Sequence, residues 1–223
     1  EFVLKNLPRT EKDNKLYKNP DNDPRGKWRA GYCVNGLYRP NLKYDIITPN
    51  GNIIKSPEKG WRWSKETLEK KIQEGEIIYN ADETAIIHKL YLNDLDGKVP
   101  ENIWTKGDAG TTRQATTELK ILFGGKAPFD TPKPTQLLER IIQIASDDKS
   151  IILDSFAGSG TTAHAVLNMN KSDGGNRKFI LVEMGDYADT ITAERVKRVI
   201  NGYGEEKNAV EGTGGNFSYY ELG

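Results

Sequence analysis

A glycine-containing loop between an apolar run and a helix is the feature that most constrains this fold. Ile151–Asp154 has the composition of a buried parallel strand, and Gly158-Ser159-Gly160 follows it closely. A helix is expected over about 161–168 and a second apolar strand over 179–183. Glycine permits positive φ angles and lets a ligand approach the backbone closely. The pattern predicts a strand–loop–helix–strand unit with a ligand at the loop.

Flanking segments extend this unit into an alternating order. A helix is expected over 190–200 and a third strand over 217–222, which gives β-α-β-α-β. Upstream, Thr135 is expected to cap a helix with one apolar face, and 116–123 to form another helix closed by two glycines. We also expect a mobile Gly-rich loop over 207–215. The C-terminal half is therefore predicted as α/β, with a partial Rossmann-like sheet.

The N-terminal half differs from the C-terminal half in composition and in its pattern of expected elements. Residues 1–30 are rich in Asn, Asp, Pro and Lys and are expected to be loop. Asn50-Gly51 lies between β-branched runs and predicts a hairpin. Further along, we expect a helix over 64–74 with Ser64 as its N-cap, and strands over 76–79 and 84–92. These elements predict a small α+β module, and we expect one domain over 1–110 and another over 111–223.

The net charge of zero hides an asymmetry. Residues 1–65 hold 14 basic and 7 acidic side chains, whereas the remainder holds 18 and 25. Aromatic residues are interleaved with the basic ones: Tyr17, Trp28, Tyr32, Tyr38, Tyr44, Trp61 and Trp63. Cations suit phosphate and flat rings suit bases, so this part favours a nucleic-acid surface. A solvated charged face with a few core aromatics is the alternative.

Several classes are disfavoured. No run approaches the roughly 20 apolar residues of a membrane span. The first residues are no signal peptide, and a cytoplasmic setting is expected. The single cysteine, Cys33, excludes an intrachain disulfide and a Cys-rich zinc site. His88 and His164 are the only histidines, and no third ligand is evident, so we expect no metal.

Two carboxylates at strand ends suggest the ligand. Glu183 follows Gly160 by 23 residues, where an acidic side chain can accept hydrogen bonds from both hydroxyls of a ribose. The loop lacks the lysine of an ATP-type phosphate loop. Gly158, Gly160 and Ala163 also satisfy a dinucleotide pattern, and spacing does not separate a nicotinamide dinucleotide from S-adenosylmethionine. Asp154 favours the second, because it would repel a pyrophosphate and attract an ammonium group. A tight turn without ligand remains an alternative.

These residues also resemble a known family. The segment 154–162 resembles the S-adenosylmethionine loop of amino-methylating DNA methyltransferases, and Glu183 matches the ribose-binding acid of the family. Lys133-Pro134-Thr135, followed by Leu137, Leu138 and Arg140, resembles the Lys-Pro segment of the beta-ordered subgroup. Asn19 to Arg29, Glu118-Leu119-Lys120 and 217–222 look like the modification (Mod) subunit of bacterial type III restriction-modification systems.

The resemblance implies a set of cofactor-binding residues: Lys133, Asp154, Phe156, Gly158, Gly160, Thr161 and Glu183. Phe156 would cover the cofactor, with core packing as its alternative. Lys133 would make a contact near the methionine end, with an ordinary solvated lysine as the alternative. Tyr187 would pack near the adenine ring or anchor the start of a helix.

One motif of the family is missing. The catalytic tetrapeptide, [Asp/Asn/Ser]-Pro-Pro-[Tyr/Trp/Phe], does not occur here, and neither Asn19-Pro20-Asp21 nor Asp23-Pro24-Arg25 replaces it. We therefore name no catalytic residue, expect the catalytic half upstream of Glu1, and expect this chain to be inactive alone. The strand 151–154 would then have an open edge, covered by another chain, a second copy or upstream residues.

The resemblance implies an S-adenosylmethionine-dependent DNA methyltransferase of a type III system. It would methylate the exocyclic amino group of a flipped adenine in duplex DNA, although cytosine remains open. Region 1–110 would recognise the target, with these candidate contacts: Lys27, Arg29, Arg39, Arg62 and Gln114. Expected partners are duplex DNA, the restriction (Res) subunit and a second Mod copy. The alternatives are a noncatalytic DNA-binding module and a nicotinamide-dependent enzyme fragment.

Overall fold

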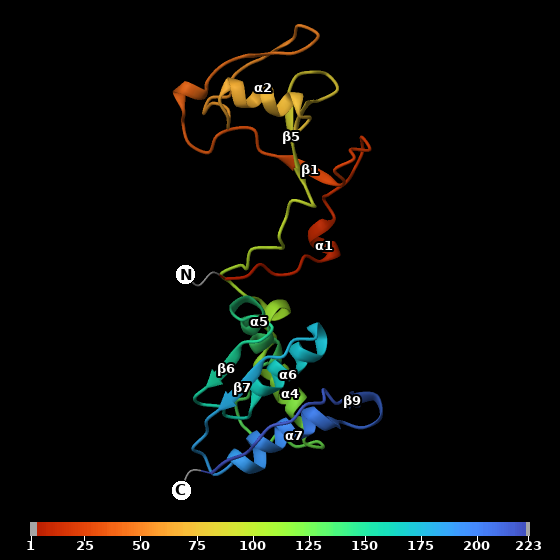
Figure 1. Cartoon of the computed structure of the whole chain (residues 1–223), viewed down its shortest axis with the longest axis vertical. Coiled ribbons are helices and arrows are strands. Elements are labelled where there is room, and N and C mark those ends of the chain that lie inside the picture. The colour runs from red at the N-terminus through yellow and green to blue at the C-terminus, as the bar shows by residue number, and fades with distance from the viewer. Residues whose placement is uncertain (1–3, 222–223) are drawn as a thin grey trace. The chain divides into compact units, whose positions relative to one another are not determined.

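The chain forms two compact units in a computed structural model, which describes residues 4–221 (Figure 1). The N-terminal unit comprises Pro8–Lys98. The C-terminal unit comprises the described residues from Val99 onward together with residues 4–7. Residues 99–110 therefore belong to the C-terminal unit, and the boundary lies before the expected position at 110. Within 4–221, no helix is both long enough and apolar enough to span a bilayer.

A three-stranded antiparallel sheet organises the N-terminal unit. Its order is β1 (Trp28–Gly31), β5 (Ile86–Tyr91) and β4 (Ile77–Tyr79), with Trp28 opposite Tyr91. Helix α2 (Lys65–Gln73) begins after Ser64, whose side chain accepts a hydrogen bond from the Thr67 amide. Trp61, Leu68 and Ile77 are buried together in the core of this unit. The predicted helix and the two predicted strands are confirmed.

Short elements complete the N-terminal unit. The Asn50-Gly51 hairpin is confirmed, because β2 (Ile46–Ile47) pairs with β3 (Ile53–Ile54) and Gly51 has a φ of +83°. The expectation of loop over 1–30 was wrong at α1 (Glu11–Asn14) and at β1. A 3₁₀ turn, η1, covers Pro40–Leu42. Strand β1 exists because it pairs along β5, a partner distant in sequence.

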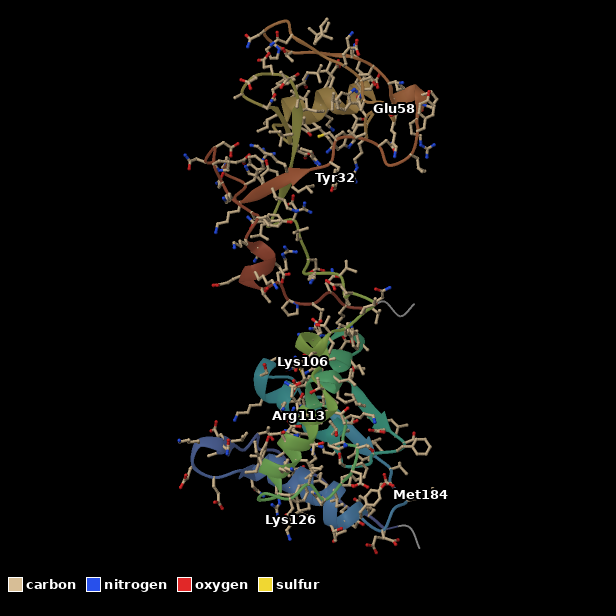
Figure 2. The ribbon with its side chains drawn as sticks, turned by 180° about the vertical axis from the view of Figure 1, so that it is seen from behind. Tyr32, Glu58, Lys106, Arg113, Lys126 and Met184 are labelled. Atoms are coloured by element: carbon tan, nitrogen blue, oxygen red, sulfur yellow. The ribbon has the colours of Figure 1, made fainter. Side chains whose placement is uncertain are left out.

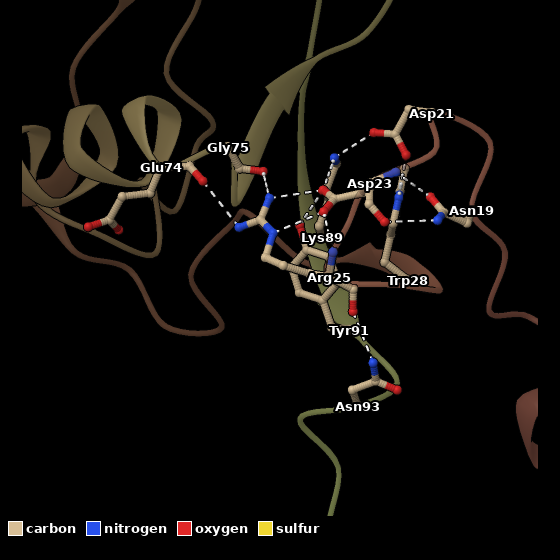
Figure 3. Close-up of polar contacts among 10 residues, drawn as sticks. All are labelled: Asn19, Asp21, Asp23, Arg25, Trp28, Glu74, Gly75, Lys89, Tyr91 and Asn93. Carbon is tan, nitrogen blue, oxygen red and sulfur yellow. Dashed lines mark hydrogen bonds and ion pairs between the residues drawn. The ribbon is translucent and has the colours of Figure 1, made fainter.

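A buried ionic cluster fixes the Asn-Asp-Pro-rich segment of the N-terminal unit (Figure 3). Asp23 accepts bonds from Arg25 at 2.9 and 3.0 Å, from Lys89 Nζ at 2.7 Å and from the Tyr91 hydroxyl at 2.8 Å. Arg25 also donates to the carbonyls of Glu74 and Gly75 at the end of α2. These donors, Arg25 first and then Lys89, lower the pKa of Asp23 despite its burial. The segment is thereby bound to both the sheet and the helix.

Two parallel strands form the centre of the C-terminal unit. β6 (Ile151–Asp154) pairs with β7 (Lys178–Leu181), so that Asp154 lies opposite Leu181. Helices α5 (Thr135–Ala145) and α6 (Thr161–Asp173) cover one face, where Ile142, Ala165 and Val166 are buried. A second core joins α6 to α4 (Thr112–Leu122) and α7 (Glu194–Asn201). α3 (Lys106–Ala109) packs near α5. The unit is mixed α/β.

The other face of this pair of strands is open to solvent. Ile151, Leu153, Ile180 and Val182 are exposed apolar side chains. Within the described part of the chain, β6 has one hydrogen-bonded neighbour, β7. Both findings leave apolar strand surface without cover in the chain as described.

Three expectations for the C-terminal unit need correction. The strand expected over 217–222 is absent from 217–221, and Leu222 lies outside the described residues. Phe217 packs into the helical core instead, and a cavity of about 740 Å³ is lined by both β7 and 215–220. Thr135 is the first residue of α5, with Pro134 at the cap position. The expected Gly-rich loop contains η3 (Glu206–Asn208) and β9 (Val210–Glu211), which pairs with β8 (Gly202–Tyr203).

Candidate functional site

The glycine loop, residues 155–160, leaves the carboxyl end of β6 and enters α6. Gly158 and Gly160 have φ angles of +54° and +77°, which explains why glycine is needed at both positions. Asp154 stabilises the turn: Oδ1 accepts from the Phe156 amide, and Oδ2 accepts from the Thr162 hydroxyl. Gly160 is the N-cap of α6, where no side chain caps the helix. The first amides of α6 therefore meet no capping side chain.

Glu183 lies beside the glycine loop, just after β7. Its Oε2 accepts a 2.7 Å hydrogen bond from the Gly158 amide, and its Oε1 accepts from the amides of Met184 and Gly185, each at 2.9 Å. Partial burial raises the pKa of this carboxyl group, but the amides of Gly185 and Gly158 and the Tyr187 hydroxyl outweigh it. The net effect lowers the pKa, so Glu183 is an oriented anion at neutral pH.

Apolar side chains surround the loop. The Phe129 and Tyr187 rings meet edge to face with centroids 5.4 Å apart, and a Cβ built on Gly158 would lie 3.4 Å from Phe129. Phe156 is 84% exposed, and Met184, labelled in Figure 2, is 90% exposed. Exposed apolar side chains next to a loop with ionised and backbone donor groups suit a ligand that has flat and polar parts.

Two other predicted cofactor residues, Lys133 and Thr161, differ in their exposure. Lys133 is exposed, and its backbone carbonyl accepts from the Thr161 hydroxyl at 3.4 Å, so the Lys-Pro segment does lie beside the start of α6. The Thr161 side chain is buried and faces the interior. Thr161 therefore supports the loop through its side chain and offers a ligand only its backbone.

A buried polar network lies behind the glycine loop, and sequence reasoning missed it. Arg195 of α7 is 1% exposed, and its guanidinium lies within hydrogen-bond distance of side chains from four segments. These partners are Glu118, Thr135, Ser159, Thr161 and His164. The sequence contained a signal for it, because in the helix expected over 190–200 Arg195 shares one face with Thr192, Val196 and Val199.

His164 is buried in this network. Burial, and then the nearby Arg195, lower the pKa of its imidazole to about 3. Arg195 has only donors, so Nδ1 of His164 must accept and the ring proton must sit on Nε2. Nε2 lies 3.5 Å from the Tyr203 hydroxyl, whose pKa is raised to about 12, chiefly by burial. The histidine is therefore neutral and serves as an acceptor.

The predicted DNA-binding residues divide between the two units. Lys27, Arg39 and Arg62 are exposed on the N-terminal unit. Arg29 is half-buried and donates to the Tyr17 hydroxyl at 2.9 Å. Gln114 is exposed on α4 of the C-terminal unit, where its side chain contacts the Thr111 hydroxyl. Tyr32, which Figure 2 labels on the N-terminal unit, is a further exposed aromatic residue that the candidate set omitted.

Comparisons with known proteins show which family the chain belongs to. Residues 2–194 match the model of the DNA methylase family, so the chain belongs to that family. The type III restriction-modification enzyme StyLTI Mod subunit of Salmonella typhimurium is 34% identical over 83% of this chain and 30% of its own length. The EcoP15I Mod subunit of Escherichia coli is 35% identical over 84% of this chain and 28% of its own length.

A type II methyltransferase is also similar. M.KpnI of Klebsiella pneumoniae is 35% identical over 65% of this chain and 38% of its own length. The expected resemblance to Mod subunits is confirmed by the two matches that span most of the chain. The chain spans less than a third of the length of those two Mod subunits.

Proposed function

We propose that this chain is the cofactor-binding and DNA-recognition portion of a DNA methyltransferase of a type III restriction-modification system. The donor would be S-adenosylmethionine, and the acceptor would be the exocyclic amino group of adenine in duplex DNA. The observation that supports this proposal most directly is the bond from the Gly158 amide to the Glu183 carboxylate. It brings the glycine loop and the acidic strand end together at the same edge of two parallel strands.

The residues of the site suit the proposed cofactor. Glu183 is ionised and can accept hydrogen bonds from ribose hydroxyls. Asp154 supplies negative charge near the loop, although its oxygens already hold Phe156 and Thr162. Phe156 and Met184 offer exposed apolar surface beside a flat base. When bound, the cofactor would supply an electrophilic methyl group, and the residues of this chain would bind and orient it.

The two units would divide the work. We propose that the C-terminal unit contains half of a Rossmann-like methyltransferase sheet. Another chain, a second copy or upstream residues would cover the open face of β6 and β7 and pair with the open edge of β6. The N-terminal unit would recognise DNA through its exposed basic residues, Lys27, Arg39 and Arg62. A Res subunit and a second Mod copy are proposed as partners because the relatives are named as Mod subunits of type III enzymes.

Titration calorimetry tests the cofactor directly. S-adenosylmethionine, its homocysteine product and a nicotinamide dinucleotide are each titrated into the full chain. The proposal expects the first two to bind and the dinucleotide neither to bind nor to compete. Binding of the dinucleotide alone would replace this proposal with the nicotinamide alternative. An absence of all binding would withdraw the cofactor assignment from this chain.

A further inference from the structure

Arg195 contacts the glycine loop from the buried interior of the C-terminal unit, whereas Phe156 in the same loop is exposed. Its Nη1 lies 3.1 Å from the Ser159 hydroxyl and 2.9 Å from the Thr161 hydroxyl. Ser159 lies between the two glycines that have positive φ, and Thr161 begins α6. Arg195 therefore holds the chain at the point where the loop changes direction.

The other side of the guanidinium holds two further segments. Nη2 lies 3.0 Å from a Glu118 carboxylate oxygen on α4 and 3.0 Å from the Thr135 hydroxyl at the start of α5. The Thr135 hydroxyl also donates to Glu118. Thr135 directly follows the Lys-Pro segment at 133–134, so this segment and the glycine loop share one anchor. The glycines give the loop backbone conformational freedom, and the hydrogen bonds from Arg195 restrict the loop to one conformation in the folded state.

The contacts match the geometry of a guanidinium. Arginine has five N–H donors in a planar fork, and five side-chain acceptors lie around this one: Glu118, Thr135, Ser159, Thr161 and His164. A lysine has one ammonium and cannot reach partners on all sides. His164 contributes an acceptor because it stays neutral, and so adds no second buried charge. The position requires the shape of arginine as well as its charge.

We propose that Arg195, together with Glu118, is a positioning residue for the cofactor site. It fixes the glycine loop and the Lys-Pro segment in the conformation that receives S-adenosylmethionine, without touching the ligand itself. This inference rests on the function proposed above, because it assigns a role toward that same ligand. It predicts that cofactor affinity depends on a side chain that is fully enclosed by protein.

The test compares Arg195→Lys with a matched core variant, Val199→Ala, in the full chain. Val199 lies on the same helix and is equally buried, but it contacts the apolar core. We expect Arg195→Lys to weaken binding of S-adenosylhomocysteine about 10-fold to 100-fold. Losses of this size follow when residues that orient the ligands of a metal site, without binding the metal, are mutated in other proteins. Val199→Ala should lower the Tm and leave the Kd of the folded protein within about twofold. Glu118→Gln keeps the arginine, and its loss of affinity for S-adenosylhomocysteine should lie between those of the other two variants. It replaces Arg195→Lys in the test if that variant does not fold.

Hydrogen exchange gives a readout that does not need the ligand. In Arg195→Lys, the amides of Ala157, Gly158 and Gly160 should exchange faster, while the amides of β7 keep their protection. Unchanged loop exchange together with unchanged affinity would overturn the inference. If the wild-type chain binds no S-adenosylhomocysteine, the proposed function fails. The exchange pattern then still decides whether Arg195 holds the loop, and unchanged loop exchange would overturn that role too.

Discussion

The backbone amide of Gly158 donates a 2.7 Å hydrogen bond to Oε2 of Glu183. The two residues are 25 positions apart in the sequence. Gly158 lies shortly after the end of β6, and Glu183 lies shortly after the end of β7, the strand parallel to it. The bond makes the loop and the carboxylate one structural unit. Any change that removes the carboxylate therefore alters the support of the loop as well as the ligand contact proposed for Glu183.

Removing the carboxylate should weaken cofactor binding. Glu183→Ala deletes an ionised acceptor, and hydrogen bonds to charged groups contribute about 1.5–3 kcal/mol, or roughly 10-fold to 150-fold in Kd. Calorimetry with S-adenosylhomocysteine measures the loss. Asp189→Ala is the control, because Asp189 is an exposed acid nearby whose partner is Lys197. Equal affinities for wild type and Glu183→Ala would refute the role of this residue.

A side chain at Gly160 should destabilise the C-terminal unit. The φ of +77° strains any L-residue, and a Cβ there would lie 3.0 Å from the Thr192 carbonyl oxygen. Gly174 has a similar φ of +72° with open space around it, so Gly174→Ala should cost only the backbone strain of about 1–2 kcal/mol. We expect Gly160→Ala to lower the Tm more than Gly174→Ala does. Similar losses for both would show that the backbone beside Thr192 moves freely.

Acid should destabilise the protein through His164. In the unfolded chain the imidazole takes up a proton below about pH 6.5, whereas in the folded protein its pKa is about 3. The unfolded state therefore binds more protons in this window, and the free energy of unfolding falls as the pH drops, by about 1.4 kcal/mol per pH unit. Denaturant titrations between pH 7 and pH 5 measure the slope.

A second variant isolates this contribution. His164→Gln keeps an acceptor but cannot titrate, so the fall in stability between pH 6.5 and 5 should be shallower than in wild type. His88 has a pKa that is also lowered, chiefly by burial, and it acts with the same sign in both proteins. The difference between the two slopes belongs to His164. Identical slopes would mean that His164 is accessible to protons in the folded state.

Asp23 should be essential to the N-terminal unit. Asp23→Asn leaves Lys89 and Arg25 without their shared buried anion, so we expect a lower Tm for this unit. Because the pKa of Asp23 is lowered, its contribution is present at neutral pH and decreases as the pH falls below about 4. Asp45→Asn is the control, since the partly exposed pair of Asp45 with Lys55 stabilises little. Equal Tm values for both variants would argue against the cluster.

DNA affinity should fall with salt in proportion to the phosphate contacts. Lys27→Ala combined with Arg62→Ala should reduce the slope of log K against log salt by about 2 if both residues contact phosphate. Fluorescence anisotropy with duplex DNA over a salt series measures it. Lys70→Ala is the control, because Lys70 is exposed on α2 and pairs with Glu74. An unchanged slope in the double variant would remove both residues from the proposed interface.

Local signals made much of the fold predictable. Ser64 and Gly75 bound one helix, Asn50-Gly51 sets one hairpin, and short apolar runs mark the strands. Strand β1 was not predictable, because Trp28 to Gly31 lie among turn-forming residues and gain strand structure only by pairing with β5. The reverse holds for 217–221, which has strand-forming residues but no hydrogen-bonded partner strand.

The site was predictable where its chemistry lies in the backbone. Glycines and a strand-end acid are visible in the sequence, and the structure brings Gly158 and Glu183 together. Phe129 and Arg195 were not predicted, because their proximity to the loop depends on how separate segments pack. Thr161 was assigned a ligand role from its place in the motif, whereas its side chain faces Arg195.

The anchoring of Asp23 has a consequence for how a protein of this kind could diversify. Both carboxylate oxygens are bound by residues of the N-terminal unit itself, the buried Lys89 and Tyr91 and the more exposed Arg25, so the path of the segment around Asp23 is held within that unit. Lys27, directly beyond Gly26, is exposed and lies outside the cluster drawn in Figure 3. Exposed positions of this kind can be exchanged during evolution while the scaffold stays constant, whereas Asp23, Arg25 and Lys89 can change only together.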